Sequence, residues 1–116
     1  MNYKNFINNK WLDSDSGRTF EVMNPFTEKV IAEVPASGKS DVNKAVEAAQ
    51  VAFKDWGTMT AGDRRDYLQA LAQTSLDHAD SLAKTISKEM GKPLKDAITE
   101  IEDLSEYLQY YSELAR

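Results

Sequence analysis

Apolar residues recur every three or four positions across most of residues 40–116, and this spacing constrains the fold more than any other feature. It places apolar side chains along one face of an α-helix. Two interruptions divide the pattern, one at Gly57 and one at Gly91-Lys92-Pro93. Glycine commonly ends helices, and proline is tolerated in their first turn. We therefore predict three amphipathic helices.

The predicted helices also carry start signals. Ser37 or Ser40 is expected to cap the first helix, with Asp41 near its positive end. Thr60 is expected to cap the second, and Asp63 follows three residues later in a pattern resembling a capping box. The apolar face of the first helix would consist of Val42, Ala45, Val46, Ala49, Phe53 and Trp56.

Residues 3–37 have the pattern of strands and turns. The segment NFINNKWL, in which Asn8-Asn9 separates two apolar pairs, predicts a short hairpin, because asparagine tolerates left-handed backbone. A second strand pair is expected at 19–23 and 30–34. The predicted fold class is α+β, with two short antiparallel strand pairs (3–37) followed by three helices (40–116) in one domain, 1–116.

Composition excludes several classes of function. The net charge of −5 argues against nucleic acid as a partner, because phosphate binding requires clustered basic residues. No apolar run approaches the roughly 20 residues that a membrane span needs, so we expect no membrane partner. The chain has no cysteine, which favours a cytoplasmic location and excludes a thiol nucleophile within these residues.

The amphipathic helices need more partner surface than they can offer one another. In chains of this size, burying apolar area at roughly 25 cal/mol per Å² barely offsets the entropy lost on ordering. The sequence therefore favours a fragment, or a domain docked on something else, over a unit that is stable alone.

The chain resembles the N-terminal part of the aldehyde dehydrogenase superfamily along nearly its whole length. Single motifs are weak signals, but their order and spacing are highly specific. The matching motifs are F-I-N-x-x-W, N-P-x-T-x-x-x-I-x-x-V-P, D-V-x-x-A-V-x-A-A-x-x-A-F-x-x-W, R-x-x-x-L, E-x-G-K-P and Y-Y. The resemblance makes this chain part of an α/β aldehyde dehydrogenase fold.

The resemblance implies an enzyme that oxidises an aldehyde to a carboxylic acid with NAD or NADP. A semialdehyde such as succinate semialdehyde is a plausible substrate, and the full-length enzyme would be a homodimer or homotetramer. The nucleophilic cysteine, the general-base glutamate motif and the glycine-rich cofactor turn of the family are all absent. We therefore expect these 116 residues to require the rest of their own polypeptide and to be inactive alone.

The resemblance also suggests a monovalent-cation site. In some members of the family, backbone carbonyls before Asn-Pro and an acid before Gly-Lys-Pro hold a cation; here these are Val22, Met23 and Glu89. Oxygen ligands suit hard cations. The alternative is that Glu89 is a solvated residue in the last turn of a helix.

One side of the third predicted helix borders the aldehyde entrance in family members. Glu100, Asp103 and Tyr107 are the candidate substrate-entrance residues, and an acidic rim would disfavour anionic aldehydes. The alternative is a solvated acidic face. Gly91-Lys92 lacks the rest of a phosphate loop and is interpreted as a joint between helices.

Two non-enzymatic alternatives remain open at this point. One is a short, non-catalytic helical interaction module derived from the same scaffold, which would bind partners through exposed apolar faces. The other is a non-catalytic relative that retains only the scaffold.

Overall fold

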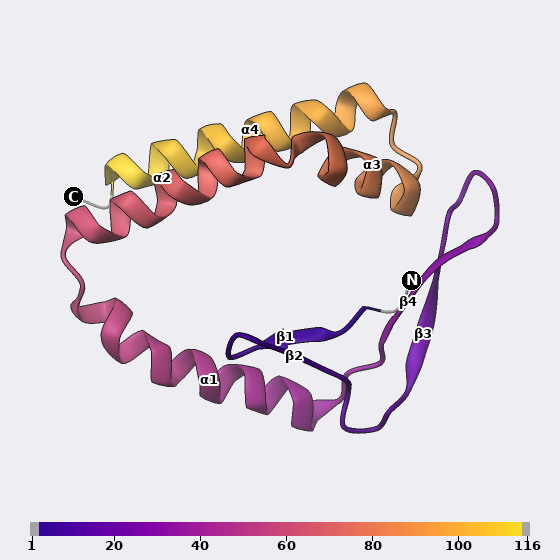
Figure 1. Cartoon of the computed structure of the whole chain (residues 1–116), viewed down its shortest axis with the longest axis horizontal. Helices are drawn as coiled ribbons and strands as arrows, with labels where there is room; N and C mark the ends of the chain where they lie inside the picture. The colour runs from indigo at the N-terminus through magenta and orange to yellow at the C-terminus, as the bar shows by residue number, and fades with distance from the viewer. Residues whose placement is uncertain (1–2, 115–116) are drawn as a thin grey trace. The chain divides into compact units, whose positions relative to one another are not determined.

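The structure, a computed structural model, describes residues 3–114 and divides into two compact units, Met1–Gly57 and Thr58–Arg116 (Figure 1). In the first unit, two antiparallel strand pairs precede a helix. In the second unit, the described residues form helices only. The α+β class predicted from the sequence is confirmed.

The first strand pair is the predicted hairpin. β1 (Asn5–Ile7) pairs antiparallel with β2 (Lys10–Leu12). The two turn residues, Asn8 and Asn9, have φ angles of 51° and 58°, which is the left-handed conformation that a two-residue hairpin turn requires. A phenylalanine and a tryptophan lie opposite each other across the strands, with ring centroids 4.8 Å apart.

The second strand pair is also where the sequence predicts it. β3 (Thr19–Met23) pairs antiparallel with β4 (Val30–Pro35). The turn between them is organised by Asn24, whose side-chain oxygen accepts hydrogen bonds from the backbone N–H groups of Phe26 and Thr27. This is the local asparagine chemistry that competes with regular structure and starts turns.

α1 (Lys39–Thr58) follows the strands, and its start differs from the prediction. Neither predicted serine caps it. Instead the Gly38 carbonyl accepts the first helical hydrogen bond, and the carboxylate of Asp41 accepts a hydrogen bond from the Gly38 N–H at 2.9 Å. The helix also continues through Gly57, because glycine weakens a helix without necessarily ending it.

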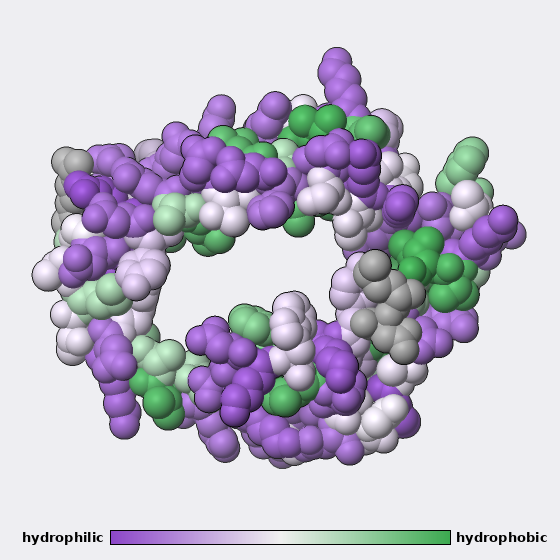
Figure 2. All heavy atoms as spheres, viewed as in Figure 1, coloured by the Kyte–Doolittle hydropathy of each residue, from purple (hydrophilic) through white to green (hydrophobic). Residues whose placement is uncertain are grey.

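The predicted apolar face of α1 is present but remains exposed. Val42, Val46 and Phe53 are all at the surface, and Phe53 is 67% exposed. Figure 2 shows hydrophobic residues interrupting the hydrophilic surface. The buried apolar residues among those described are mostly small: Ala32, Ala72, Ala83, Ala97 and Ile101. This agrees with the expectation that the chain lacks partner surface.

The described part of the chain has four helices rather than the three predicted. The second predicted helix divides into α2 (Ala61–Asp77) and α3 (Ala79–Met90), and α4 (Leu94–Leu114) follows. At the division, His78 leaves the helical region with φ −107° and ψ 9°. The division lets both α2 and α3 contact α4. Apolar periodicity continues across His78, so the sequence pattern does not reveal the break.

Small side chains form the centre of the second unit. Ala72 of α2 and Ser105 of α4 are almost fully buried, and the Ser105 hydroxyl donates a hydrogen bond to the Ala72 carbonyl at 3.3 Å. A side chain can reach the backbone of a neighbouring helix only where the two helices approach closely, and small residues permit that approach. Other residues in this packed seam are Ala83, Ala97 and Ser112.

The joint between α3 and α4 follows the predicted chemistry. Gly91 has a φ of 75°, and its N–H donates to the Ser87 carbonyl, so it ends α3 as a left-handed cap. The Pro93 carbonyl accepts a hydrogen bond from the Ala97 N–H. α4 itself begins one residue later, at Leu94.

No helix within residues 3–114 combines the length and apolarity needed to cross a bilayer.

Candidate functional site

The described residues offer neither a cluster of metal-ligating side chains nor a thiol. They include no group of three or more His, Cys, Asp or Glu side chains arranged to hold a metal ion. The chain has no cysteine and a single histidine, His78, whose backbone joins α2 to α3. A thiol nucleophile is therefore missing from the part of the chain that the structure describes.

The three substrate-entrance candidates lie on one side of α4. Glu100, Asp103 and Tyr107 are spaced so that a continuous helix places them on one face. All three are exposed, and Tyr107 is 64% exposed. The buried residues of α4 include Ala97 and Ile101. The structure thus brings the three candidates together on an outward face, while their contact with an aldehyde stays a prediction.

A lysine from the helix joint neutralises one of these acids. Lys92 Nζ lies 2.6 Å from Glu100 Oε2, and both side chains are partly exposed. Asp103 has no ion-pair partner among the described residues. The acidic face is therefore less negative than its sequence suggests. Sequence reasoning assigned Lys92 only to the joint between helices and missed this pair.

The cation-site candidates are distributed over both units. Val22 and Met23 belong to β3, where the pairing register with β4 shifts between them. Such an irregularity leaves the local ladder disrupted, which suits a site that uses backbone carbonyls. Glu89 belongs to α3 in the other unit and is exposed. The cation site stays a prediction.

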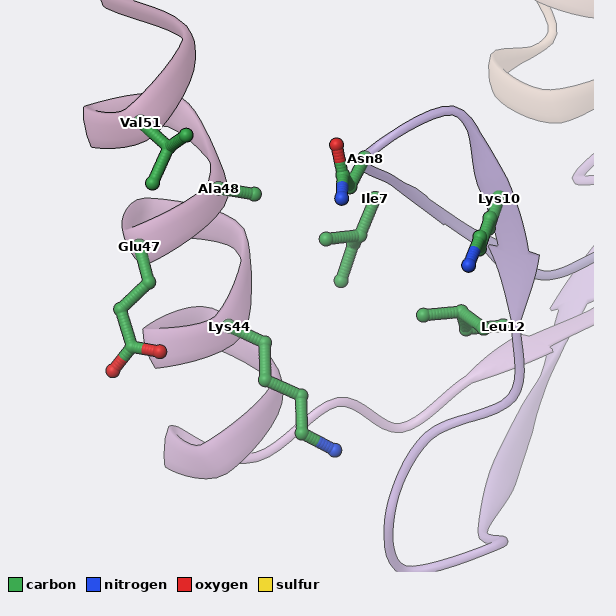
Figure 3. A pocket seen from close by; sticks show the side chains of 8 residues that line it. All are labelled: Ile7, Asn8, Lys10, Leu12, Lys44, Glu47, Ala48 and Val51. Carbon is green, nitrogen blue, oxygen red and sulfur yellow. The ribbon is translucent and has the colours of Figure 1, made fainter.

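A groove of about 360 Å³ lies between the β1–β2 hairpin and α1 (Figure 3). Ile7 and Leu12 extend from the hairpin toward the helix, and Lys44 extends from the helix toward the hairpin. The remaining lining residues are Asn8, Lys10, Glu47, Ala48 and Val51. The groove carries two lysines and one acid, but no hydroxyl or thiol side chain.

A second hollow of about 360 Å³, lined by polar side chains, lies between α2 and α4. Gln69 donates to Glu113 at 3.5 Å, and Gln109 donates to the Ser105 hydroxyl at 3.2 Å. These contacts occupy the amide groups within the unit itself. The hollow therefore presents no arrangement typical of catalysis.

The pKa values of two side chains near the start of α1 are shifted. A hydrogen bond from Lys44, aided by one from the Ser40 hydroxyl at 2.6 Å, lowers the pKa of Asp15 below its usual value. The same contact raises the pKa of Lys44. Opposite charges at short range favour both ionised forms. This pair links the β2–β3 turn to the helix.

Comparison with known proteins identifies the family. The model of the aldehyde dehydrogenase family matches residues 11–116, and the chain belongs to this family. It is 36% identical over 111 residues to the glutarate-semialdehyde dehydrogenase of Pseudomonas putida, covering 96% of this chain and 23% of that protein. It is 37% identical over 110 residues to the mitochondrial succinate-semialdehyde dehydrogenase of Arabidopsis thaliana, covering 95% and 21%.

The structural comparison agrees. The chain matches the structure of 3,6-anhydro-L-galactose dehydrogenase in complex with NAP at a TM-score of 0.96 and 32% sequence identity. This match covers all of the present chain and 24% of the other. The chain therefore spans less than a quarter of the length of each of these three proteins.

Proposed function

We propose that these residues are the leading portion of an NAD(P)-dependent aldehyde dehydrogenase that oxidises an aldehyde to a carboxylic acid. The observation that carries the proposal is the family match over residues 11–116, combined with coverage of only 21% to 24% of the matched proteins. The chain alone is inactive in this proposal, because it lacks a thiol nucleophile.

In the whole enzyme, NAD or NADP would accept a hydride from the aldehyde carbon. The described residues contain no glycine-rich turn between a strand and a helix, so none of them is assigned to the cofactor. The contribution of this segment is instead structural, together with one wall of the aldehyde entrance.

We infer that the entrance wall is the α4 face with Glu100, Asp103 and Tyr107. An anionic semialdehyde, such as succinate semialdehyde, is repelled by this acidic face. The ion pair between Lys92 and Glu100 weakens that repulsion, because it cancels one of the two negative charges. This supports a semialdehyde as a substrate despite the acidic helix.

The proposal is tested on the polypeptide encoded by the reading frame that continues past Arg116. We expect a glycine-rich turn, a glutamate motif and a cysteine motif in that continuation, and aldehyde-dependent reduction of NAD or NADP by the purified protein. A frame that closes at Arg116, or a complete protein that oxidises no aldehyde, contradicts the proposal. Turnover by the 116-residue chain alone contradicts its predicted inactivity.

The entrance wall has its own test in that enzyme. Lys92→Gln leaves Glu100 uncompensated, and we expect KM for succinate semialdehyde to rise by about two- to fivefold, as expected for one extra charge at close range in water. KM for a neutral aldehyde should not change. Lys95→Gln removes the same charge three residues away and serves as the control. Equal effects of both substitutions contradict this role for the α4 face.

A second function is favoured by the exposed apolar face of α1. In this alternative the chain is a non-catalytic helical module that binds a partner through Val42, Val46 and Phe53. A native stop codon after Arg116 favours the module. A cooperative thermal melt of the monomeric chain, followed by circular dichroism, contradicts the expectation that it needs further partner surface.

We also propose four features of the complete protein. Val22, Met23 and Glu89 hold a monovalent cation, the enzyme is a homodimer or homotetramer, and it is cytoplasmic, without a nucleic-acid partner. The register shift in β3 supports the first, and the net charge of −5 supports the last. Isothermal titration with Na⁺ and K⁺, comparing Glu89→Gln with wild type, tests the cation site.

A further inference from the structure

The start of α1 is tied to the turn after β2 by a buried carboxylate. Asp41 is only 5% exposed. One of its oxygens accepts a hydrogen bond from the Asp15 N–H at 2.9 Å, and the other accepts one from the Gly38 N–H, also at 2.9 Å. Buried carboxylates require such partners, because an unpaired buried charge is strongly unfavourable. Asp41 thus joins segments that are 26 residues apart.

A second carboxylate completes the connection in the opposite direction. Asp15, in the turn, accepts hydrogen bonds from the Ser40 hydroxyl at 2.6 Å and from Lys44 Nζ, both on α1. Asp41 of the helix binds the backbone of the turn, and Asp15 of the turn binds side chains of the helix. Hydrogen bonds to charged groups are stronger than those between neutral groups. These reciprocal contacts therefore stabilise the start of α1 more than the same number of neutral hydrogen bonds would.

Little apolar packing accompanies these reciprocal hydrogen bonds. Within the described part of the first unit, Ala32 is the one hydrophobic residue classed as buried. Two further polar links join the segment before α1 to the rest of the unit. The exposed side chains of Asn5 and Ser37 are 2.8 Å apart, and the Ala36 N–H donates a hydrogen bond to the Arg18 carbonyl at 2.8 Å. Both of these links precede the helix, so the first turn of α1 itself is held against residues 13–18 mainly by the two carboxylates.

We propose that Asp15 and Asp41 form a conformational latch. When the latch is closed, the first turn of α1 is fixed against residues 13–18. When the Asp41 charge is removed, α1 separates from this turn, while each strand pair keeps its own ladder. The charged groups around the latch are Asp15 in the turn and Lys44 on α1. This device is independent of the proposed enzymatic activity.

The test is amide hydrogen exchange in the complete protein, resolved to single amides and corrected for intrinsic rates. In wild type, the Asp15 and Gly38 amides should be protected. Asp41→Asn should accelerate exchange at both amides by about 10- to 100-fold, the size expected for hydrogen bonds to a charged group. The control is Asp13→Asn, because Asp13 is exposed and pairs only with Lys4 among the described residues. This control should leave both amides protected.

Three results overturn the latch. They are unprotected Asp15 and Gly38 amides in wild type, unchanged protection in Asp41→Asn, and equal loss of protection in Asp13→Asn. If Asp41→Asn also abolishes protection in the β3–β4 ladder, Asp15→Asn decides the question. That variant keeps Asp41 and the ladder, and we expect it to accelerate exchange at Gly38 by several fold. An unchanged hydrogen-exchange rate at the Gly38 amide contradicts the coupling between Asp15 and Asp41.

Discussion

Each of the two units is stabilised internally, and the kind of contact differs between them. In the first unit, buried carboxylate oxygens join a helix to a turn, and hardly any apolar side chain is buried. In the second, alanine and serine side chains let three helices approach closely. Substitutions that remove a charge should therefore affect the stability of the first unit most, and substitutions that change side-chain volume should affect that of the second unit most.

The largest expected effect tests the role of volume. Ala72→Leu adds bulk to the buried seam between α2 and α4, and overpacking of this kind costs about 1–3 kcal/mol. Ala49→Leu makes the same change on the exposed face of α1 and should alter stability by less than about 0.5 kcal/mol. Urea unfolding followed by circular dichroism measures both. Equal losses would show that the first unit also has a tightly packed interior.

A smaller effect concerns the start of α2. Thr60 caps this helix by accepting a hydrogen bond from the Asp63 N–H at 3.1 Å. Thr60→Ala should destabilise the second unit by about 1 kcal/mol. Thr85→Ala, which removes an exposed hydroxyl in the middle of α3, is the control and should change little. The unfolding midpoint in urea distinguishes the two, and an unchanged midpoint in Thr60→Ala would show that the cap is dispensable.

Replacing two glycines of the second unit by alanine should change stability in opposite directions. Gly91→Ala places a side chain at a φ of 75° and should destabilise by about 1 kcal/mol. Gly62→Ala lies inside α2, where the nearest atom to an added Cβ is 3.8 Å away, and should stabilise by about 0.4–1 kcal/mol. Thermal melts of both variants provide the comparison, and a shift of the same sign in both is the contradicting result.

The smallest expected effect is a pH dependence of the first unit. The folded-state pKa of Asp15 is lowered from its ordinary value of 3.8 by Lys44 and Ser40. Its contribution is therefore present above that value, and it is lost as the pH falls through the folded-state pKa. NMR titration of the Asp15 carboxyl should show a midpoint below 3.8 in wild type and a shift back toward it in Lys44→Gln. Identical midpoints would exclude the ion pair.

Local chemistry made much of the fold predictable. The Asn8-Asn9 turn, the Thr60 cap and the Gly91 terminator each depend on residues within a few positions, and each is confirmed. The division at His78 was missed, because apolar spacing continues across it and the break follows from packing of both halves on α4.

The candidate residues show the same limit. The resemblance proposed Glu100, Asp103 and Tyr107 on one side of a helix, and all three lie on α4; their contact with an aldehyde stays a prediction. The spacing could not identify Lys92 as the partner of Glu100. It also assigned Asp41 only to a helix end, although its second partner lies in the turn after β2. Contacts between distant segments depend on tertiary structure, which periodicity does not encode.

The joint at Gly91 and Pro93 has a consequence for self-association. Exchange of a helix between two copies requires the joint that precedes it to open, for example by straightening into one continuous helix. Here Gly91 would have to leave its left-handed conformation for a helical one. Helical geometry is also unfavourable for Lys92, because Lys92 precedes a proline. Pro93 would also lack the N–H needed inside a fused helix. The joint therefore protects the chain against domain swapping of α4.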